Sequence, residues 1–289
     1  MGIESNGAAF LISARKSGVS FSRSITIGRQ TVKFGLGSLG SMLRQAGFTI
    51  PQEDQDRIFS GDGYAEPFLR LLGADEAESF DNSDYEHATH IGDLNQPIES
   101  SLKGRYTAVI DGGSTEHVFN YPQAIKNCME LLQVGGHYLG IVPANNLCGH
   151  GFYQFSPELM FRVFAPENGF QVERVYIAEQ IPGAKWMRMP DPAEVARRIE
   201  YGGRRPAYLY VRARKVAEAK IFGTIPQQSD YVSYWAVGAG DHKRRKGVSR
   251  IKNLIGGLPS PFKRTIVAAT SVIKRRRDPA IKPVDIFID

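Results

Sequence analysis

Short apolar runs alternate with segments of helical periodicity along most of the chain. The runs are rich in β-branched and aromatic residues, and several stop at a glycine or an acidic residue, which is typical of buried strands. They predict seven strands, at residues 24–30, 77–81, 88–93, 106–111, 137–143, 171–178 and 207–214. Strands that alternate with helices predict an α/β sandwich built around a mostly parallel sheet.

Helices are predicted from apolar spacing and from the residues that begin and end helices. Leu36, Leu39 and Leu43 recur at helical spacing before Gly47, and a second short helix at 65–72 is closed by Gly73. Further helices are expected between Asn120 and Gly135, and from Ser156 onward, where a hydroxyl precedes a proline. Asp191 and Glu194 flank Pro192 in a capping arrangement, which predicts a short helix there.

The last two strands set the expected shape of the sheet and of the domain. No long crossover helix separates residues 178 and 207, so we expect an antiparallel edge strand. Residues 1–240 are predicted to form one domain, with the insertion at 182–206 as a lid over the site. Residues 241–289 are predicted to be a separate basic tail.

The amino-acid composition is that of a globular protein without disulfide bonds or membrane-spanning segments. Of 289 residues 42% are hydrophobic, which is ordinary for a chain that buries a core. The two cysteines, Cys128 and Cys148, give neither a disulfide framework nor the spacing of a metal site, so we expect a reducing compartment and no metal. No apolar run is long enough to span a membrane, and the start lacks the cationic segment of a secretory signal. A cytoplasmic protein is expected.

The basic character of the chain is confined to its end. Residues 242–289 hold 13 Lys/Arg against 3 Asp/Glu, although the net charge of the whole chain is only +6. Phe262, Ile266 and Ile273 would share one face of a helix beginning at Pro261. A basic amphipathic helix binds anionic membrane surfaces, which would place the protein at the inner face of the membrane. A solvated tail or a helix packed on the acidic body remains the alternative. The chain lacks a nucleic-acid motif, so we expect no nucleic-acid partner.

Candidate binding residues gather where the predicted strands end. In open α/β sheets ligands bind outside the carboxyl ends of the strands, near the point where the strand order reverses. Gly28, Asp81, Asp93 and the segment Asp111-Gly112-Gly113 all lie at or near the carboxyl ends of predicted strands. Acidic residues that end successive strands are unusual for a buried core, so a ligand crevice is predicted at this edge.

Two stretches, FDNSDYEHATHIGDLNQPI and YTAVIDGGSTEHVFNYPQAIKNCMELLQVGGHYLGIVP, carry a family resemblance, together with NNLCGHGFYQFSPELMFRVF. They resemble class I S-adenosylmethionine-dependent methyltransferases, in a bacterial methyltransferase-like subfamily, and the resemblance covers about residues 24–214. It implies a Rossmann-like three-layer sandwich with a seven-stranded sheet, S-adenosylmethionine as cofactor, and transferase activity.

The resemblance assigns roles to particular residues. It implies that Asp81 holds the ribose hydroxyls, that Asp93 with Leu94 holds the adenine, and that Asp111, Gly112 and Gly113 lie beside the methionine part of the cofactor. Glu116 and His117 match the Glu-His pair that commonly follows. His150 lies after the fifth strand, on the side where a substrate is expected. The expected catalytic residues are therefore His117 and His150 as candidate bases, with Glu116 beside them.

The first-strand motif departs from the family pattern of an acid followed by alternating glycines. Thr26 stands in place of the acid, Gly28 matches the first glycine, and Gln30 replaces the second glycine. Glycines at these positions let the backbone approach the cofactor closely. Gly28 and Gln30 are nevertheless the expected cofactor contacts in this loop.

Three functions are consistent with these residues. The first is methyl transfer to an oxygen or nitrogen of a small molecule or saccharide, with polysaccharide biosynthesis as an analogy only. The second is a catalytically inactive methyltransferase-like protein that binds a ligand or serves as a scaffold. The third is an enzyme of the same fold that uses another nucleotide-like ligand. The sequence leaves the acceptor and the oligomeric state open.

Overall fold

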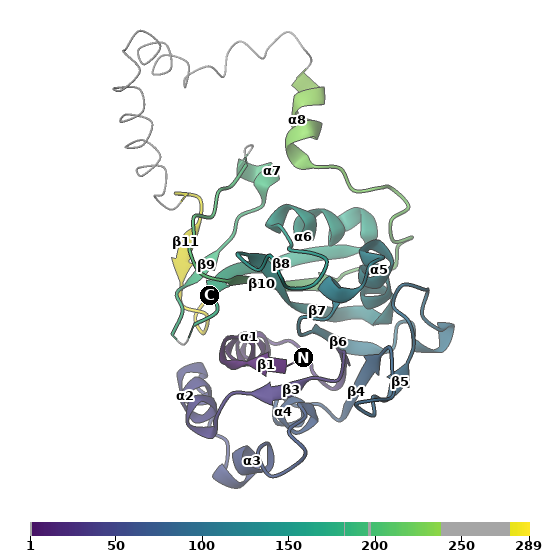
Figure 1. Ribbon diagram of the computed structural model, residues 1–289. Helices are drawn as coiled ribbons and strands as arrows, with labels where there is room; N and C mark the ends of the chain where they lie inside the picture. The colour runs from purple at the N-terminus through teal and green to yellow at the C-terminus, as the bar shows by residue number, and fades with distance from the viewer. Residues whose placement is uncertain (1, 182, 196–197, 238–277) are drawn as a thin grey trace. The chain divides into compact units, whose positions relative to one another are not determined.

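A computed structural model describes residues 2–181, 183–195, 198–237 and 278–289. A single sheet of nine strands forms the centre of the fold (Figure 1). Its order is β11-β9-β8-β10-β7-β6-β2-β4-β5. The strands are β2 (Arg23–Ile27), β4 (Glu76–Asp81), β5 (His90–Ile91), β6 (Tyr106–Asp111), β7 (Leu132–Asn145), β8 (Phe170–Glu179), β9 (Trp186–Arg188), β10 (Ala207–Lys215) and β11 (Lys282–Val284).

The directions of the strands make this a Rossmann-like sheet. β5, β4, β2, β6 and β7 are parallel neighbours, and β10 runs antiparallel between β7 and β8. The strand order reverses between β2 and β6, because the chain moves from β2 to β4 on one side and from β6 to β7 on the other. The α/β class is confirmed, with nine strands in place of seven.

The last predicted strand is antiparallel as expected, but its predicted place at the edge is wrong. β10 lies inside the sheet, with β7 on one side and β8 on the other, and the two edges are β11 and β5. The short connection from β8 indicated the direction of β10 correctly, because antiparallel strands need no long crossover. It could not indicate that β10 also pairs with β7, which lies more than 60 positions earlier in the chain.

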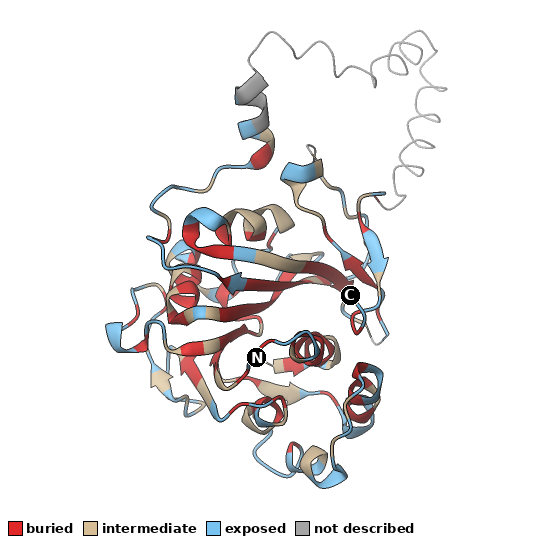
Figure 2. Cartoon of the chain, turned by 180° about the vertical axis from the view of Figure 1, so that it is seen from behind, coloured by how far each residue is buried: buried red, intermediate tan, exposed pale blue. Residues whose placement is uncertain are grey.

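Helices cover both faces of the sheet, which gives the three layers (Figure 1). One face packs against α1 (Ser5–Lys16) and α4 (Glu66–Leu71), and α2 (Leu36–Ala46) packs on α1; Ala108 and Ile110 of β6 belong to the same core cluster. The other face packs against α5 (Tyr121–Leu131) and α6 (Pro157–Val163). On that side Tyr138 stacks on Phe164 with ring centroids 4.6 Å apart. Figure 2 shows the buried residues concentrated in the sheet and in α1.

Several helix boundaries agree with the residues that predicted them. Gly47 ends α2 in the left-handed conformation at φ 83°, and Ser156 Oγ accepts a hydrogen bond from Leu159 N at the start of α6. α5 ends earlier than predicted, because the chain enters β7 directly at Leu132. Short elements without a strong pattern were missed: β1 (Gly2–Glu4), β3 (Thr31–Lys33), α3 (Gln52–Arg57), η1 (Ser100–Leu102), η2 (Thr115–His117) and η3 (Pro166–Asn168).

The N-terminal segment was also missed, and it contributes to the main core. α1 buries eight consecutive residues, 7–14, so it lacks the amphipathic stripe that marks a surface helix. β1 pairs in parallel with β3 and forms a small second sheet with it. This pairing draws the chain after β2 toward the N-terminus before α2 begins.

The chain divides into two compact units that differ from the predicted domains. The first unit contains residues 1–189, 203–226 and 282–289, and the second contains 190–202 and 227–281. Residues 282–289, predicted as part of the tail, supply β11 to the main sheet. In the second unit the structure describes α7 (Pro192–Val195) and α8 (Ser229–Val237). The predicted amphipathic helix from Pro261 lies outside the described residues. Within the described part of the chain no helix has the length and apolar character needed to cross a membrane.

Candidate functional site

The carboxyl ends of β2 and its neighbours bring the predicted cofactor residues to one edge of the sheet. Gly28 follows β2, adopts φ 69°, and donates its backbone N–H to Phe80 O at 2.8 Å. Residue 28 thus takes a conformation that glycine adopts without strain, which accounts for the glycine that the sequence retained there. Asp81 ends β4 directly beside this turn.

Among the described residues, the Asp81 carboxylate makes only long hydrogen bonds. Oδ2 accepts from Arg29 N at 3.4 Å, and Oδ1 accepts from Ser83 N at 3.3 Å. The residue is half-buried. Two weak partners leave most of the lone pairs of this carboxylate free to accept hydroxyl donors from a ligand.

Asp93 and Leu94 lie further along the same edge. Asp93 is exposed, and its Oδ1 accepts from Asn95 N at 2.8 Å and from Asn95 Nδ2 at 2.7 Å, so one oxygen closes the local turn. Leu94 is buried against the body of the protein. Asp93 therefore presents a single carboxylate oxygen toward solvent.

Asp111 has a different surrounding from the other strand-end acids. It is 0% exposed, and its Oδ1 accepts from the backbone N–H groups of Ser114 at 2.9 Å and Thr115 at 3.3 Å. Oδ2 accepts from Thr115 Oγ1 at 2.5 Å and Tyr138 OH at 3.0 Å. Four donors occupy this carboxylate, so its side chain holds the turn and the strand end together. Within the predicted segment, Gly112 and Gly113 are therefore the residues left to contact a cofactor.

Gln30 occupies the space that a glycine would leave open. Its side chain is 1% exposed and donates Nε2 to Ile27 O at 2.8 Å and to Ser114 Oγ at 3.2 Å. A Cβ placed on Gly112 would lie 2.6 Å from Gln30 Oε1, so the carboxamide packs directly on this glycine. Oε1 itself is buried without a hydrogen-bond partner among the described residues.

A cavity of about 230 Å³ opens beside these glycines. Gly112 and Gly113 form part of its wall, Glu116 and His150 form another part, and Tyr208 of β10 lines it from the neighbouring strand. β1, α1 and β3 contribute Glu4, Gly7 and Lys33, so the N-terminal segment that the sequence missed covers this cavity. No signal in the sequence linked residues 2–7 to residues 112–150.

Glu116 is the most unusual side chain of the cavity. It is 0% exposed, and neither carboxylate oxygen has a hydrogen-bond partner among the described residues. Burial and the negative charge of Asp111 raise the pKa of Glu116 to about 8. Burial of Tyr208, with the charges of Glu116 and Glu4, raises the pKa of that phenol to about 12. Buried carboxylates without compensating partners are expensive, and they occur most often where function requires them.

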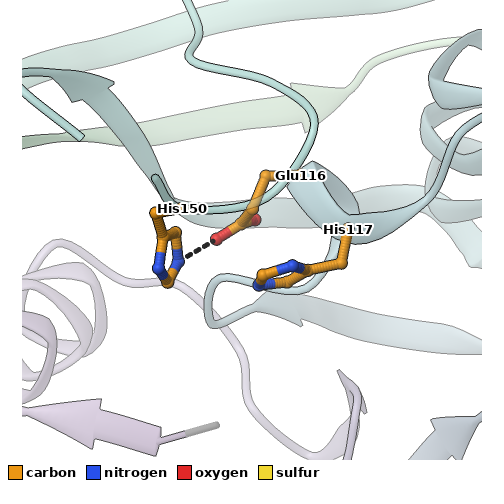
Figure 3. A group of neighbouring side chains, drawn as sticks. All are labelled: Glu116, His117 and His150. Atoms are coloured by element: carbon orange, nitrogen blue, oxygen red, sulfur yellow. Dashed lines mark ion pairs between the residues drawn. The ribbon is translucent and has the colours of Figure 1, made fainter. Parts of the chain in front are cut away.

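His117 and His150 approach Glu116 from two segments (Figure 3). His150 Nε2 lies 3.4 Å from Glu116 Oε1, and the two imidazole ring centroids are 5.0 Å apart. Partial desolvation of the ring lowers the pKa of His117, and the neighbouring His150 lowers it further. The predicted catalytic trio, His117, His150 and Glu116, therefore comes together in space.

Local backbone contacts hold the two segments in this arrangement. Phe152 N donates to Glu116 O at 2.8 Å, and His150 N donates to Leu147 O at 2.9 Å. Gly151 adopts φ 69°, and a Cβ there would lie 2.8 Å from Glu116 O. The loop after β7 reaches the turn after β6 only because residue 151 has no side chain.

Comparison with known proteins found solved structures that have low similarity to this chain. No known protein family matches the chain, and no curated protein matches it. An S-adenosylmethionine-dependent methyltransferase from Mesorhizobium loti is 13% identical, with a TM-score of 0.41, over 73% of this chain and 99% of that one. A mutant form of a 16S rRNA (adenine(1408)-N(1))-methyltransferase from Catenulisporales acidiphilia is 11% identical, with a TM-score of 0.36, over 71% and 93%. Because these TM-scores are low, the fold is assigned from the order and direction of this chain's own strands.

Proposed function

We propose that this protein transfers a methyl group from S-adenosylmethionine to an oxygen or nitrogen of a small molecule or saccharide. The observation that carries the proposal is the cavity at the ends of β6 and β7, where the Gly112-Gly113 turn faces Glu116 and His150. The cavity lies beside the reversal of strand order, the usual place for a ligand in an open α/β sheet. The sequence resemblance to class I methyltransferases points to the same edge.

The cofactor would be held by residues of three neighbouring strand ends. We assign the ribose hydroxyls to Asp81, the adenine to Asp93 with Leu94, and the methionine part to Gly28, Gly112 and Gly113. Support comes from the weakly bonded carboxylate of Asp81 and from the absence of a Cβ along the turn after β6.

The packing of the Gln30 side chain bears on whether the cofactor fits at this turn. Its orphaned Oε1 is an acceptor that an ammonium donor would satisfy, which fits the amino group of the methionine part. Its side chain also fills the space over Gly112, and that observation favours the second candidate function, a binding protein without methyl transfer. The two candidates differ in what the Gln30→Gly variant does.

The chain's own residues supply proton transfer and orientation. Bound S-adenosylmethionine supplies a methyl group on a positively charged sulfur, and alignment of the acceptor with that methyl carries much of the acceleration. The acceptor's proton would pass to the imidazole of His150, whose Nε2 lies 3.4 Å from Glu116 Oε1, and the ionised form of Glu116 would stabilise the resulting imidazolium. His117 is the second candidate base, since its lowered pKa keeps the ring neutral near pH 7.

Calorimetric titration with S-adenosylhomocysteine tests the proposal. We expect micromolar binding by the full chain, a loss of at least tenfold in Asp81→Ala, and no change in the exposed control Glu53→Ala. A Gln30→Gly variant that binds more weakly supports Gln30 as a cofactor contact. No heat at millimolar ligand in the full chain, with binding gained in Gln30→Gly, would support the inactive candidate.

We also propose that the basic residues 242–277 contact an anionic membrane surface, on the cytoplasmic side. The support is their charge alone, since positive residues near an anionic leaflet are each attracted by about 1 kcal/mol. Because β11 follows this segment and belongs to the main sheet, truncation is a poor test of it. Glutamine substitutions at 243–246 and 274–277 retain β11.

A further inference from the structure

Three potential metal ligands converge at the cavity, from two segments that are far apart in the sequence. Glu116 and His117 lie on the η2 turn after β6, and His150 lies on the loop after β7. One carboxylate oxygen and one nitrogen from each ring lie within 4.8 Å of one another. We propose that these three side chains bind one divalent transition-metal ion, of which zinc is the representative.

The donor set is suited to such an ion. Two imidazole nitrogens and one carboxylate are the protein ligands of several catalytic zinc sites and of non-haem iron sites, in which further positions stay open. Magnesium and calcium prefer oxygen ligands alone, so the two rings argue against them. The expectation of no metal came from the lack of a metal-binding spacing, because adjacent residues and one distant histidine match no common pattern.

Charge supports a cation at this position. The carboxylates of Asp111 and Glu116 are both fully buried, and neither is paired with a lysine or arginine side chain among the residues that the structure describes. Asp111 is compensated by four hydrogen-bond donors, whereas Glu116 has only the nitrogen of His150 at 3.4 Å. A divalent cation beside Glu116 would displace the proton of this buried carboxyl and compensate the negative charge that then forms, for which the described part of the chain supplies no hydrogen-bond partner.

The geometry needs only small side-chain movement. Ligand atoms about 2.0–2.2 Å from a tetrahedral zinc ion lie about 3.2–3.6 Å from one another, and the pair Nε2–Oε1 is already 3.4 Å apart. To bring all three ligand atoms to coordination distance, the rings of His117, which is exposed, and of His150, which is 41% exposed, would move. The fully buried Glu116 is the fixed ligand toward which both rings turn.

Open coordination positions would face the cavity. Glu116 and His150 both line it, together with Tyr208 and the Gly112-Gly113 turn. An oxygen or nitrogen of a small molecule in the cavity would therefore reach the metal, which would lower the pKa of its proton. With the metal bound, the lone pairs of His117 and His150 are used in coordination, so in the proposed methyl transfer the metal activates the acceptor in place of these bases, and the acceptor's proton would leave to water.

Metal binding does not depend on the proposed methyl transfer, and its test uses no activity. The full chain is treated with chelator, exchanged into chelator-free buffer, and titrated with zinc by calorimetry and with cobalt(II) by visible absorption. We expect one metal per chain and the visible bands of cobalt bound to nitrogen and oxygen ligands. Glu116→Gln, His117→Ala and His150→Ala are each expected to weaken binding by at least tenfold.

His87→Asn is the matched control, because His87 is exposed, lies outside the cluster and has φ 53°, a conformation that asparagine tolerates. It should bind metal as the unchanged chain does. Circular dichroism of every variant checks that each is folded, and His117→Ala, at an exposed position, retains the buried core. Zinc binding that is absent in the full chain, or that is as tight in any of the three ligand variants as in the unchanged chain, overturns the proposal.

Discussion

Replacing Glu116 by glutamine should stabilise the metal-free protein at alkaline pH and have little effect at acidic pH. Glu116 is fully buried, and its carboxylate oxygens lack hydrogen-bond partners among the described residues. Its pKa is raised from 4.5 to about 8 in the folded state by burial and by the charge of Asp111. Folding therefore favours the protonated form of this carboxyl.

The direction of the pH dependence follows from the raised pKa. Below pH 4.5 the carboxyl is protonated in both the folded and the unfolded state, and it contributes no penalty. Between pH 4.5 and about 8 the unfolded chain releases its proton first, so stability falls as the pH rises and then levels off. A pKa difference of this size corresponds to roughly 5 kcal/mol at most.

Glutamine has nearly the same shape and does not titrate. We expect Glu116→Gln and the unchanged chain to have similar free energies of unfolding at about pH 5, and the variant to be more stable by roughly 3–5 kcal/mol at about pH 9. The ionisable groups near this carboxyl are His117, His150, Asp111, Tyr121 and Tyr208. All are present in both proteins, so the difference isolates residue 116.

Urea unfolding at several pH values across this range, with chelator present throughout, measures this difference. Glu167→Gln, at an exposed position, is the control and should show no pH-dependent difference. A difference that is constant with pH, or a variant that is less stable than the unchanged chain at alkaline pH, would refute the account of Glu116 as a buried carboxyl without compensation.

Three further predictions rest on individual side-chain contacts, and a fourth rests on the charge of residues 242–277. Asp111→Asn should lower the free energy of unfolding by about 3 kcal/mol or more, since it disturbs four buried hydrogen bonds; chemical denaturation measures this, and an unchanged midpoint would contradict it. Gly151→Ala should weaken zinc binding by at least tenfold, because a Cβ 2.8 Å from Glu116 O pushes the His150 loop away; calorimetry checks this, with Gly149→Ala, where a Cβ meets nothing within 4 Å, as the control. Gln30→Gly should change S-adenosylhomocysteine affinity at least tenfold, and unchanged affinity would place Gln30 outside the cofactor site. Glutamines at 243–246 and 274–277 should abolish co-sedimentation with anionic vesicles, and equal sedimentation would exclude the membrane contact.

The framework of the fold was predictable because each element carries its own signal. β6 begins and ends where the apolar run 106–111 predicted, and the hydroxyl of Ser156 caps α6 as its position before a proline indicated. These features depend on a few neighbouring residues and on burial, which periodicity reports directly. The failures lie where no local signal exists: α1 is buried on all sides, and β11 joins the sheet from a segment whose charge suggested a tail.

Four of the residues that line the cavity, Gly112, Gly113, Glu116 and His150, were singled out from the sequence, but their surroundings could not be predicted. The sequence singled out Asp111 as an acid at a strand end and Gln30 as a departure from a glycine motif. It could not indicate that four donors occupy Asp111, or that the Gln30 carboxamide packs on Gly112. The role of Gln30 depends on neighbours such as Ser114, which is 84 positions away in the chain.

By itself the sequence determined that β4 ends at Asp81 and β6 at Asp111, and which end of the chain carries the positive charge, since these are properties of consecutive residues. Only the tertiary structure decided that Glu116, His117 and His150 form one cluster. Residues 116 and 150 belong to turns after adjacent parallel strands, and the register of β6 with β7 brings those turns to the same edge. The backbone bond from Phe152 to Glu116 then fixes one histidine beside a carboxylate that the fold has removed from water. Contacts between strand ends arise from pairing across the sheet, and no local pattern along the chain encodes them.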